Sequence, residues 1–277
     1  MKNILVVIDG LNFSASQLDS VLYISRLMKG KLTVALLDVE PSPFPMLLPG
    51  IQEAMYYSAA SMATHVRERH EQVVANTEKL REACTGRGMK ITLHTYTEAP
   101  LASVIRESRF ADVLLAMHSL SFSGLPQSDP PGFMQALFSG AECPVLTLPD
   151  NMQVVKEIAL TYNGTFSSMF AIRAFFQLMP LLALRKVKLV YVAENNLETL
   201  PDEQLLRQYI KGVCPRAEYI ILKGDPAKSL LTYLRYSKHT LVTFGAYGRS
   251  RASRFFNGSI ADDTLGLGHL YTFITHP

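Results

Sequence analysis

The hydrophobic pattern of this chain alternates between short apolar runs and longer segments with a helical stripe. An apolar run at residues 4–8 is followed by helical spacing at residues 18–27 and by a second run at residues 32–37. Continuous short runs are typical of strands buried in a parallel sheet, whereas apolar positions three or four apart are typical of a helix with one buried face. The pattern therefore predicts an α/β protein.

The same order of elements recurs in the second half of the chain. Residues 4–10 (ILVVIDG) resemble residues 158–164 (IALTYNG), because each apolar run ends in a short polar residue and a glycine. Ser or Thr and a helical pattern follow in both cases, and the second helix again leads to an apolar run, at residues 187–192. This degenerate repeat predicts two units of the same fold.

Each unit is expected to contain five strands that alternate with helices. The runs at residues 144–148 and 271–275 close the two halves as their final strands. This order predicts two tandem five-stranded parallel-sheet α/β sandwiches, with helices on both faces of each sheet. We place the boundary near Pro149, which gives a first domain of residues 1–150 and a second domain of residues 151–277.

The first half is longer than the second because of residues 40–90. This segment begins with a Pro-rich apolar loop at residues 41–49 and continues as one long helix from about Gln52 to Ala83. We expect the helix to pack against its own sheet. The loop could cover an edge of the sheet or take part in a homodimer, and the sequence leaves both open.

A glycine pattern near the end of the chain carries the clearest chemistry. It reads Gly245-x-x-Gly248, then nine residues, then Gly258-Ser259, and it follows an apolar run at residues 241–244. Two glycines after a parallel strand let the backbone approach a ligand without a Cβ in the way. A Gly-Ser pair that opens a helix offers amide groups and a hydroxyl, which suit phosphate. The pattern therefore predicts a nucleotide site, and the alternative is that the glycines only serve tight turns.

Taken with three further segments, this pattern resembles that of a known family. The segments are residues 4–10, residues 224–227 (GDPA) and residues 143–146 (CPVL). Over almost its whole length the chain resembles a tandem universal stress protein, in which two domains of that family are fused. The resemblance implies Rossmann-like, adenine nucleotide alpha hydrolase-like sandwiches that pair through their last strands, here within one chain. It also implies a stress-response role and an adenine nucleotide bound at the carboxyl ends of the strands.

The family's nucleotide contacts can be carried onto the second half. The end of the first strand would face the adenine and phosphate region, and the end of the second would touch the adenine. The end of the fourth strand would line the adenine and ribose, and the glycine pattern would wrap the phosphates and ribose. The residues that the resemblance places at the ligand are Tyr162, Asn163, Val192, Phe244, Gly245, Gly248, Arg249, Gly258, Ser259 and Ile260.

Several of these residues have a purely structural alternative. Val192 and Phe244 could be ordinary core positions. Asn163 and Ser259 could cap helices, and Arg249 could be a solvated side chain in a loop.

One position departs from the family pattern. The family usually has Asp where this half has Asn163. A carboxylate helps to hold a metal or the adenine edge, whereas the Asn side chain keeps only hydrogen bonds. A monophosphate ligand or a metal-free binding mode is therefore open here, beside magnesium-assisted binding of ATP or ADP.

The first half keeps Asp9 but lacks the glycines. Met117 and Leu120 stand where the second half has its first two glycines, and residues 130–133 (PPGF) replace the Gly-Ser pair. Side chains at these positions would fill the space that a ribose phosphate needs. We therefore expect no nucleotide in the first domain, where Asp9 is expected to be a helix N-cap.

Composition narrows the class of protein. The chain has 277 residues, of which 48% are hydrophobic and 18% charged, so a packed core is expected. Its net charge of +3 is too mild to favour nucleic acid or an anionic membrane. The three cysteines show no metal-binding spacing, and the first apolar run is too short for a signal peptide, so we expect a cytoplasmic protein with reduced thiols.

Three functions remain open from the sequence. No Ser-His-Asp or Cys-His arrangement, no metal-ligand set and no GxxxxGK[ST] motif is found, so no catalytic residue is assigned. The first function is an adenine-nucleotide-binding regulatory module with its ligand in the second domain. The second is a slow ATPase or an adenylate-transferring enzyme, and the third is a stress scaffold without a ligand.

Overall fold

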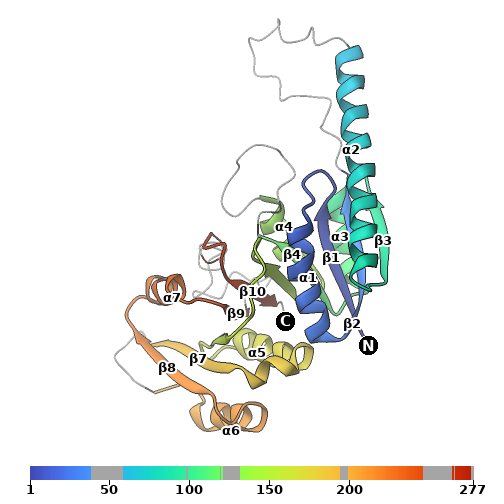
Figure 1. Cartoon of the computed structure of the whole chain (residues 1–277). Coiled ribbons are helices and arrows are strands. Elements are labelled where there is room, and N and C mark those ends of the chain that lie inside the picture. Colours follow the sequence, from blue (N-terminus) through green and yellow to red (C-terminus); the bar gives the residue numbers. More distant parts are fainter. Residues whose placement is uncertain are drawn as a thin grey trace, which may run out of the picture.

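The computed structural model describes residues 1–38, 59–97, 99–118, 120, 132–193, 199–245, 264 and 266–275. The strands in this part of the chain are β1 (Lys2–Asp9), β2 (Gly30–Leu37), β3 (Ile91–Tyr96), β4 (Val113–Met117), β5 (Val145–Leu148), β6 (Glu157–Thr161), β7 (Lys186–Ala193), β8 (Glu218–Lys223), β9 (Thr240–Gly245) and β10 (Tyr271–Thr275). Together they form one sheet in the order β3-β2-β1-β4-β5-β10-β9-β6-β7-β8 (Figure 1).

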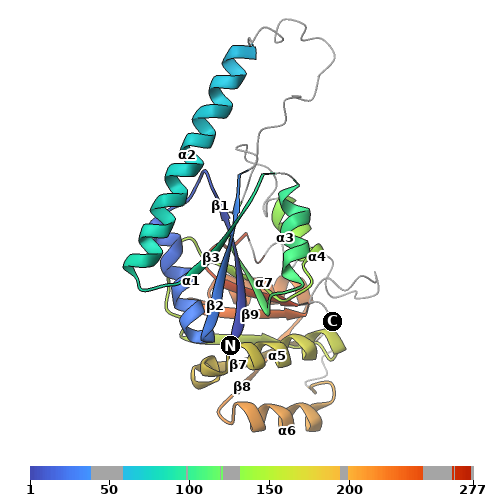
Figure 2. The same cartoon turned by 90° about the vertical axis from the view of Figure 1, so that its right-hand side faces the viewer.

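Helices cover both faces of this sheet. Those in the described part are α1 (Ala15–Met28), α2 (Ala59–Gly86), α3 (Pro100–Ser108), α4 (Gly132–Gly140), α5 (Phe166–Leu178), α6 (Glu203–Val213), α7 (Pro226–Arg235) and the 3-10 helix η2 (Pro180–Leu184). One hydrophobic core lies between the sheet and α1, α2, α5 and α6, and the other lies under α3, α4 and α7. Figure 2 shows α1 and α2 on one side of the strands, with α3 and α4 on the other.

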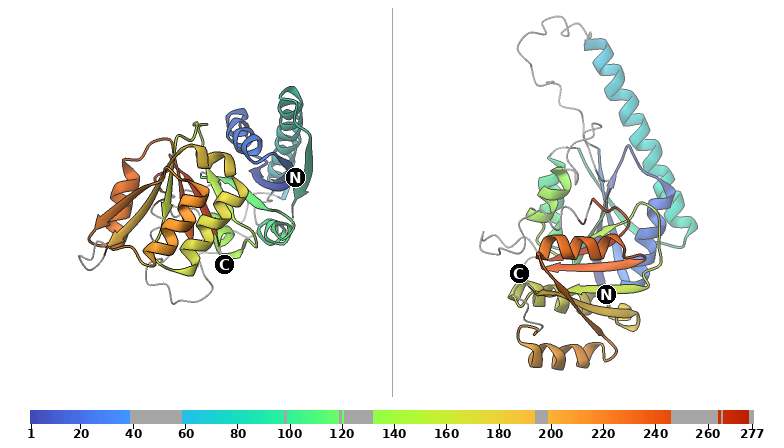
Figure 3. Two further views of the ribbon diagram at one scale, coloured as in Figure 1. Left: turned by 90° about the horizontal axis from the view of Figure 1, so that it is seen from below. Right: turned by 90° about the vertical axis from the view of Figure 1, so that its left-hand side faces the viewer.

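The sheet consists of two halves with the same strand order. Read from its outer edge, the first half runs β3-β2-β1-β4-β5 and the second runs β8-β7-β6-β9-β10. Figure 3 shows the two halves side by side, with the blue-to-green part of the chain next to the yellow-to-red part. Strands within each half are parallel, as the alternating pattern predicted.

The two halves meet at an antiparallel pair of strands. In this pair Leu146 of β5 lies opposite Phe273 of β10. Pairing through the last strands was implied by the family resemblance, and it is observed here within one chain. The two sheets expected from the sequence are therefore joined into a single continuous sheet, because the edge strand of each half pairs its backbone groups with the edge strand of the other.

The sequence explains which strands are central and which are peripheral. All residues of β4, β5, β9 and β10 are buried, and these strands consist of apolar residues, threonines and one glycine. The outermost strands, β3 and β8, are only half-buried and carry charged or polar residues. Central strands covered on both faces need apolar side chains on both faces, whereas edge strands do not.

Helix α1 begins later than the sequence suggested. Its N-cap is Ser14, which forms a capping box with Gln17. The expectation that Asp9 caps this helix is wrong, because the Asp9 carboxylate accepts hydrogen bonds from the Leu11 amide (2.9 Å) and from Asn12 Nδ2 (2.6 Å). Asp9 thus shapes the loop that precedes the cap.

Helix α2 packs on the first half as expected and ends at Gly86 rather than Ala83. The expected start at Gln52 and the Pro-rich loop lie outside the described residues. Figure 1 shows the helix running well past the end of the sheet. Near its middle, Asn76 Nδ2 donates hydrogen bonds to the carbonyl oxygens of Gly10 (2.9 Å) and Leu11 (3.0 Å), which fixes the loop after β1.

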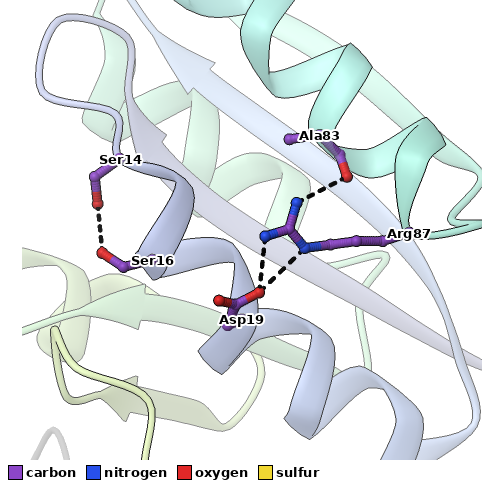
Figure 4. A network of polar contacts seen from close by, with 5 residues as sticks. All are labelled: Ser14, Ser16, Asp19, Ala83 and Arg87. Atoms are coloured by element: carbon purple, nitrogen blue, oxygen red, sulfur yellow. Dashed lines mark hydrogen bonds and ion pairs between the residues drawn. The ribbon is translucent and has the colours of Figure 1, made fainter.

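An ion pair also ties the end of α2 to α1. The guanidinium of Arg87 donates to Asp19 Oδ1 at 3.1 and 3.0 Å and to the carbonyl oxygen of Ala83 at 3.2 Å (Figure 4). Both charged side chains are partly exposed, so solvent screens this pair. It orients the two helices more than it stabilises them.

Tyrosine hydroxyls hold the segment between the halves. The Val155 amide donates to the Tyr23 hydroxyl of α1 at 3.0 Å. The Tyr271 hydroxyl of β10 donates to the Gln153 carbonyl at 2.6 Å. The connection is therefore attached to both halves, and it is not a free linker.

Candidate functional site

The strand order reverses between β6 and β9 in the second half. From β6 the chain proceeds to β7 on one side, while β9 lies on its other side, with Leu160 opposite Thr243. In sheets of this kind ligands bind outside the carboxyl ends of the strands at such a reversal. The carboxyl ends of β6, β7 and β9 therefore form the candidate ligand-binding site.

Half of the sequence-predicted site residues lie at these strand ends. Asn163 follows β6, Val192 lies near the end of β7, and Gly245 ends β9, with Tyr162 and Phe244 next to them. The other predicted residues lie outside the described part of the chain: Gly248, Arg249, Gly258, Ser259 and Ile260.

The side chains of the described residues point to two different faces of the sheet. Val192 and Phe244 belong to the core on the α7 side, whereas Tyr162 belongs to the core on the α5 and α6 side. The Tyr162 hydroxyl donates to the Pro201 carbonyl at 3.1 Å, and burial raises its pKa. The structure therefore does not bring the side chains of Tyr162 and Val192 to one surface.

Phe244 and Val192 differ in how far they are covered. Phe244 is fully buried, and Val192 is half-buried. Val192 is thus the apolar strand end with some surface to offer an adenine ring, whereas the Phe244 side chain fills the core beneath. The sequence could not separate the two, because both are apolar residues near the end of a strand.

Gly245 has a packing role that the sequence did not indicate. A Cβ built on this residue would lie 1.9 Å from the Ser167 carbonyl oxygen and 2.6 Å from the Ser168 amide nitrogen. These are backbone atoms of the first turn of α5, which cannot move aside without moving the helix. The glycine therefore lets α5 lie directly on the end of β9, next to the loop after β6.

Asn163 fixes that loop. Its Oδ1 accepts hydrogen bonds from the Thr165 amide (3.1 Å) and the Thr165 hydroxyl (2.7 Å). Thr165 is the true N-cap of α5, because its hydroxyl oxygen accepts from the Ser168 amide at 3.3 Å. Sequence reasoning offered Asn163 as the cap and overlooked Thr165, although a Thr just before a helical pattern is a standard cap signal.

Among the described residues, the other end of the Asn163 side chain has no hydrogen-bond partner. Its Nδ2 atom is buried and unpaired. The orientation of the amide is set by the Thr165 amide group, which can only donate and so requires the oxygen of Asn163 to face it. A buried donor without an acceptor is costly and calls for an explanation, such as a ligand atom.

The first half differs from the second at the equivalent places. Residue Ile4 pairs with Val113 in the first half as Ile158 pairs with Leu241 in the second. Counting along the strands puts Met117 where Gly245 stands, which confirms the sequence alignment of these two residues.

The loop after the first strand also differs in length. Asp9 precedes its N-cap, Ser14, by five residues, whereas Asn163 precedes Thr165 by two. The longer loop gives Asp9 internal partners for both of its carboxylate oxygens. The first half therefore combines a bulky side chain at the end of β4 with a loop whose polar side chain is already satisfied.

The described residues contain neither a metal-binding cluster nor an exposed thiol. Within them, no three His, Cys, Asp or Glu side chains are grouped so as to hold a metal ion. The cysteines Cys84, Cys143 and Cys214 are buried and form no disulfide, and burial raises the pKa of Cys143 to about 12. No helix in the described part is long and apolar enough to cross a membrane. What the strand ends offer is hydrogen bonding and apolar contact.

The architecture is that of doubly wound α/β proteins, and comparison with known proteins makes this more specific. No protein-family model and no curated protein sequence matches the chain. Solved structures do match over its full length. A universal stress protein from Archaeoglobus fulgidus superposes with a TM-score of 0.67 at 12% identity, covering 98% of this chain and 98% of that one.

Two structures from Pseudomonas aeruginosa agree with this result. A putative universal stress protein has a TM-score of 0.60 at 13% identity and covers 100% of this chain and 93% of its own. A protein described as functionally unknown has a TM-score of 0.59 at 14% identity, with 100% and 92% coverage. The chain therefore has the universal stress protein fold along its entire length.

Proposed function

We propose that this chain is a tandem universal stress protein whose second domain binds an adenine nucleotide. Residues 1–150 and 151–277 form the two domains, and each contributes five strands to the common sheet. The protein acts as a regulatory module of the stress response, in which the nucleotide alters shape or partner affinity. Three buried, unpaired cysteines fit a reducing compartment such as the cytoplasm.

The observation that carries this proposal is the unpaired Nδ2 of Asn163 at the reversal of strand order. It lies at the carboxyl edge of the sheet, where ligands of such folds bind. Val192 supplies a half-buried apolar strand end on the neighbouring strand. The glycine pattern predicted to wrap the phosphates starts at Gly245, directly after β9.

The first domain is a structural partner in this proposal. Met117 places a side chain where the second half has a glycine, and both carboxylate oxygens of Asp9 accept hydrogen bonds from its own loop. Its contribution is the antiparallel pair of β5 and β10, which completes the sheet.

The test is a thermal-shift experiment with purified full-length protein. ATP, ADP or AMP at millimolar concentration should raise the melting temperature, because a ligand that binds only the folded state stabilises it. Gly248→Val should abolish the shift by placing a branched side chain in the predicted phosphate path. Gly212→Val serves as the control, because a Cβ at Gly212 meets nothing within 4 Å.

Two results would reject the proposal. One is the absence of any shift with all three nucleotides, with and without magnesium. The other is an undiminished shift in Gly248→Val, which would place the binding site elsewhere in the molecule.

A further inference from the structure

The two halves treat the polar residue after their first strand in opposite ways. In the first half both oxygens of Asp9 accept hydrogen bonds, from the Leu11 amide and from Asn12. In the second half the Oδ1 of Asn163 accepts two hydrogen bonds from Thr165, while its Nδ2 is buried with no partner among the described residues. The Asp9 side chain is thus hydrogen-bonded at both ends, whereas Asn163 retains a donor that can bind a ligand atom.

The loop lengths explain this difference. One residue lies between the strand-end side chain and the N-cap in the second half, and four lie between them in the first. The short loop brings Thr165 close enough to donate two hydrogen bonds to the same oxygen, Asn163 Oδ1. Only Gly164 lies between Asn163 and the cap, and Nδ2 has no acceptor among the described residues.

The position of Asn163 favours the phosphate side of the site over the adenine side. Through Thr165 it braces the first turn of α5, and that turn lies directly against Gly245. Gly245 in turn begins the pattern predicted to hold phosphate. The apolar strand end suited to adenine, Val192, lies on the neighbouring strand β7.

The chemistry of the side chain then decides the sign of the interaction. An amide Nδ2 can only donate, so it attracts a phosphate oxygen directly. A carboxylate at this place would repel the phosphate unless a cation lay between them.

We infer that Asn163 Nδ2 donates a hydrogen bond directly to a phosphate oxygen of the nucleotide, so that binding at this site needs no divalent cation. This inference rests on the proposed function, because it concerns the same site. It adds the mode of phosphate recognition and assigns one atom to it. It also gives a reason for the amide in place of a carboxylate.

Isothermal titration calorimetry on the full-length protein tests the inference. AMP, ADP and ATP are titrated separately in EDTA and in excess magnesium. For the wild type, the Kd of the nucleotide that binds best should agree between the two buffers within about two-fold. Asn163→Asp should weaken binding in EDTA by about ten-fold or more, because a donor becomes a negative charge. Magnesium should restore part of that loss.

The variant keeps the local structure, so a loss of binding can be interpreted. Aspartate retains an oxygen for the Thr165 amide and hydroxyl, and the melting temperature without ligand reports whether the fold is intact. Asp9→Asn is the matched control in the first half, and it should leave the Kd unchanged.

The outcomes separate the two claims. Absence of binding in every buffer rejects the proposed function and this inference together. Wild-type binding that requires magnesium rejects the inference and leaves the proposed function standing. Equal affinity of wild type and Asn163→Asp in EDTA also rejects it, because Asn163 would then not contact phosphate.

Discussion

Leu146 and Phe273 lie opposite each other in the antiparallel pair of strands that joins the two halves. They occupy equivalent positions, because Leu146 pairs with Leu115 of β4 and Phe273 pairs with Thr243 of β9. An approximate two-fold axis therefore passes through this pair. Both side chains are fully buried, and the Phe273 ring meets that of Phe175 edge-on at 5.9 Å. The junction is thus part of the core.

Truncating the junction should destabilise the whole molecule. Phe273→Ala leaves a cavity between the halves and should lower the free energy of unfolding by about 3–5 kcal/mol. Phe110→Ala should change it by less than about 0.5 kcal/mol, because Phe110 is 77% exposed. Chemical denaturation measures both. A mild effect of Phe273→Ala would mean that the antiparallel pair is not a cooperative part of the fold.

The glycine at the end of β9 should be indispensable for packing. Gly245→Ala forces its Cβ onto the backbone of Ser167, so we expect a loss of about 3 kcal/mol or more in unfolding free energy. Gly212→Ala, on an open face of α6, should be neutral or stabilise by up to about 1 kcal/mol. Denaturation curves compare the two, and a normally stable Gly245→Ala would show that α5 does not lie on the end of β9.

The cap of α5 should contribute a measurable part of the stability. Thr165→Ala removes the acceptor of the Ser168 amide and one donor to Asn163, so it should cost about 1 kcal/mol or more. Thr165→Ser keeps the hydroxyl and should retain most of that stability. The midpoints of urea unfolding, compared at an unchanged dependence of the unfolding free energy on urea concentration, measure the difference between the two variants. If Ala and Ser at this position behave alike, the hydroxyl is not the cap.

Alkaline pH should destabilise the protein through a buried tyrosine of the junction. Burial raises the pKa of Tyr271 from 10.0 to about 12, so the folded state holds this proton more tightly than the unfolded state. Its contribution is complete below pH 10 and is lost as the pH rises toward 12. Melting temperatures across this window should fall less steeply for Tyr271→Phe than for the wild type. Equal slopes would show that Tyr271 does not titrate with unfolding.

Much of the fold could be predicted from the sequence, because buried strands are recognisable as short apolar runs. Runs such as residues 4–8 and 241–244 are apolar because both of their faces are covered. Parallel strands with crossover helices then allow few topologies. The alignment of Met117 with Gly245 was also confirmed, because the register along such strands cannot slip without changing the buried face.

The local structure of the candidate site could not be predicted from the sequence, because it depends on contacts that form only in the folded chain. Asp9 was expected to be a cap, but the chain continues to Ser14 before the helix begins. Gly245 was interpreted as room for a ligand, and its contact with Ser167 depends on where a helix lies in space. The unpaired Nδ2 of Asn163 is likewise a property of the folded loop, and composition or spacing does not reveal it.

The most direct test of the central claim is a crystal structure of the full-length protein grown with AMP, ADP or ATP in the absence of magnesium. The account predicts the nucleotide at the carboxyl ends of β6, β7 and β9, with a phosphate oxygen within hydrogen-bond distance of Asn163 Nδ2. A nucleotide bound in the first half, or a structure at saturating ligand in which Asn163 Nδ2 still has no partner, would contradict it.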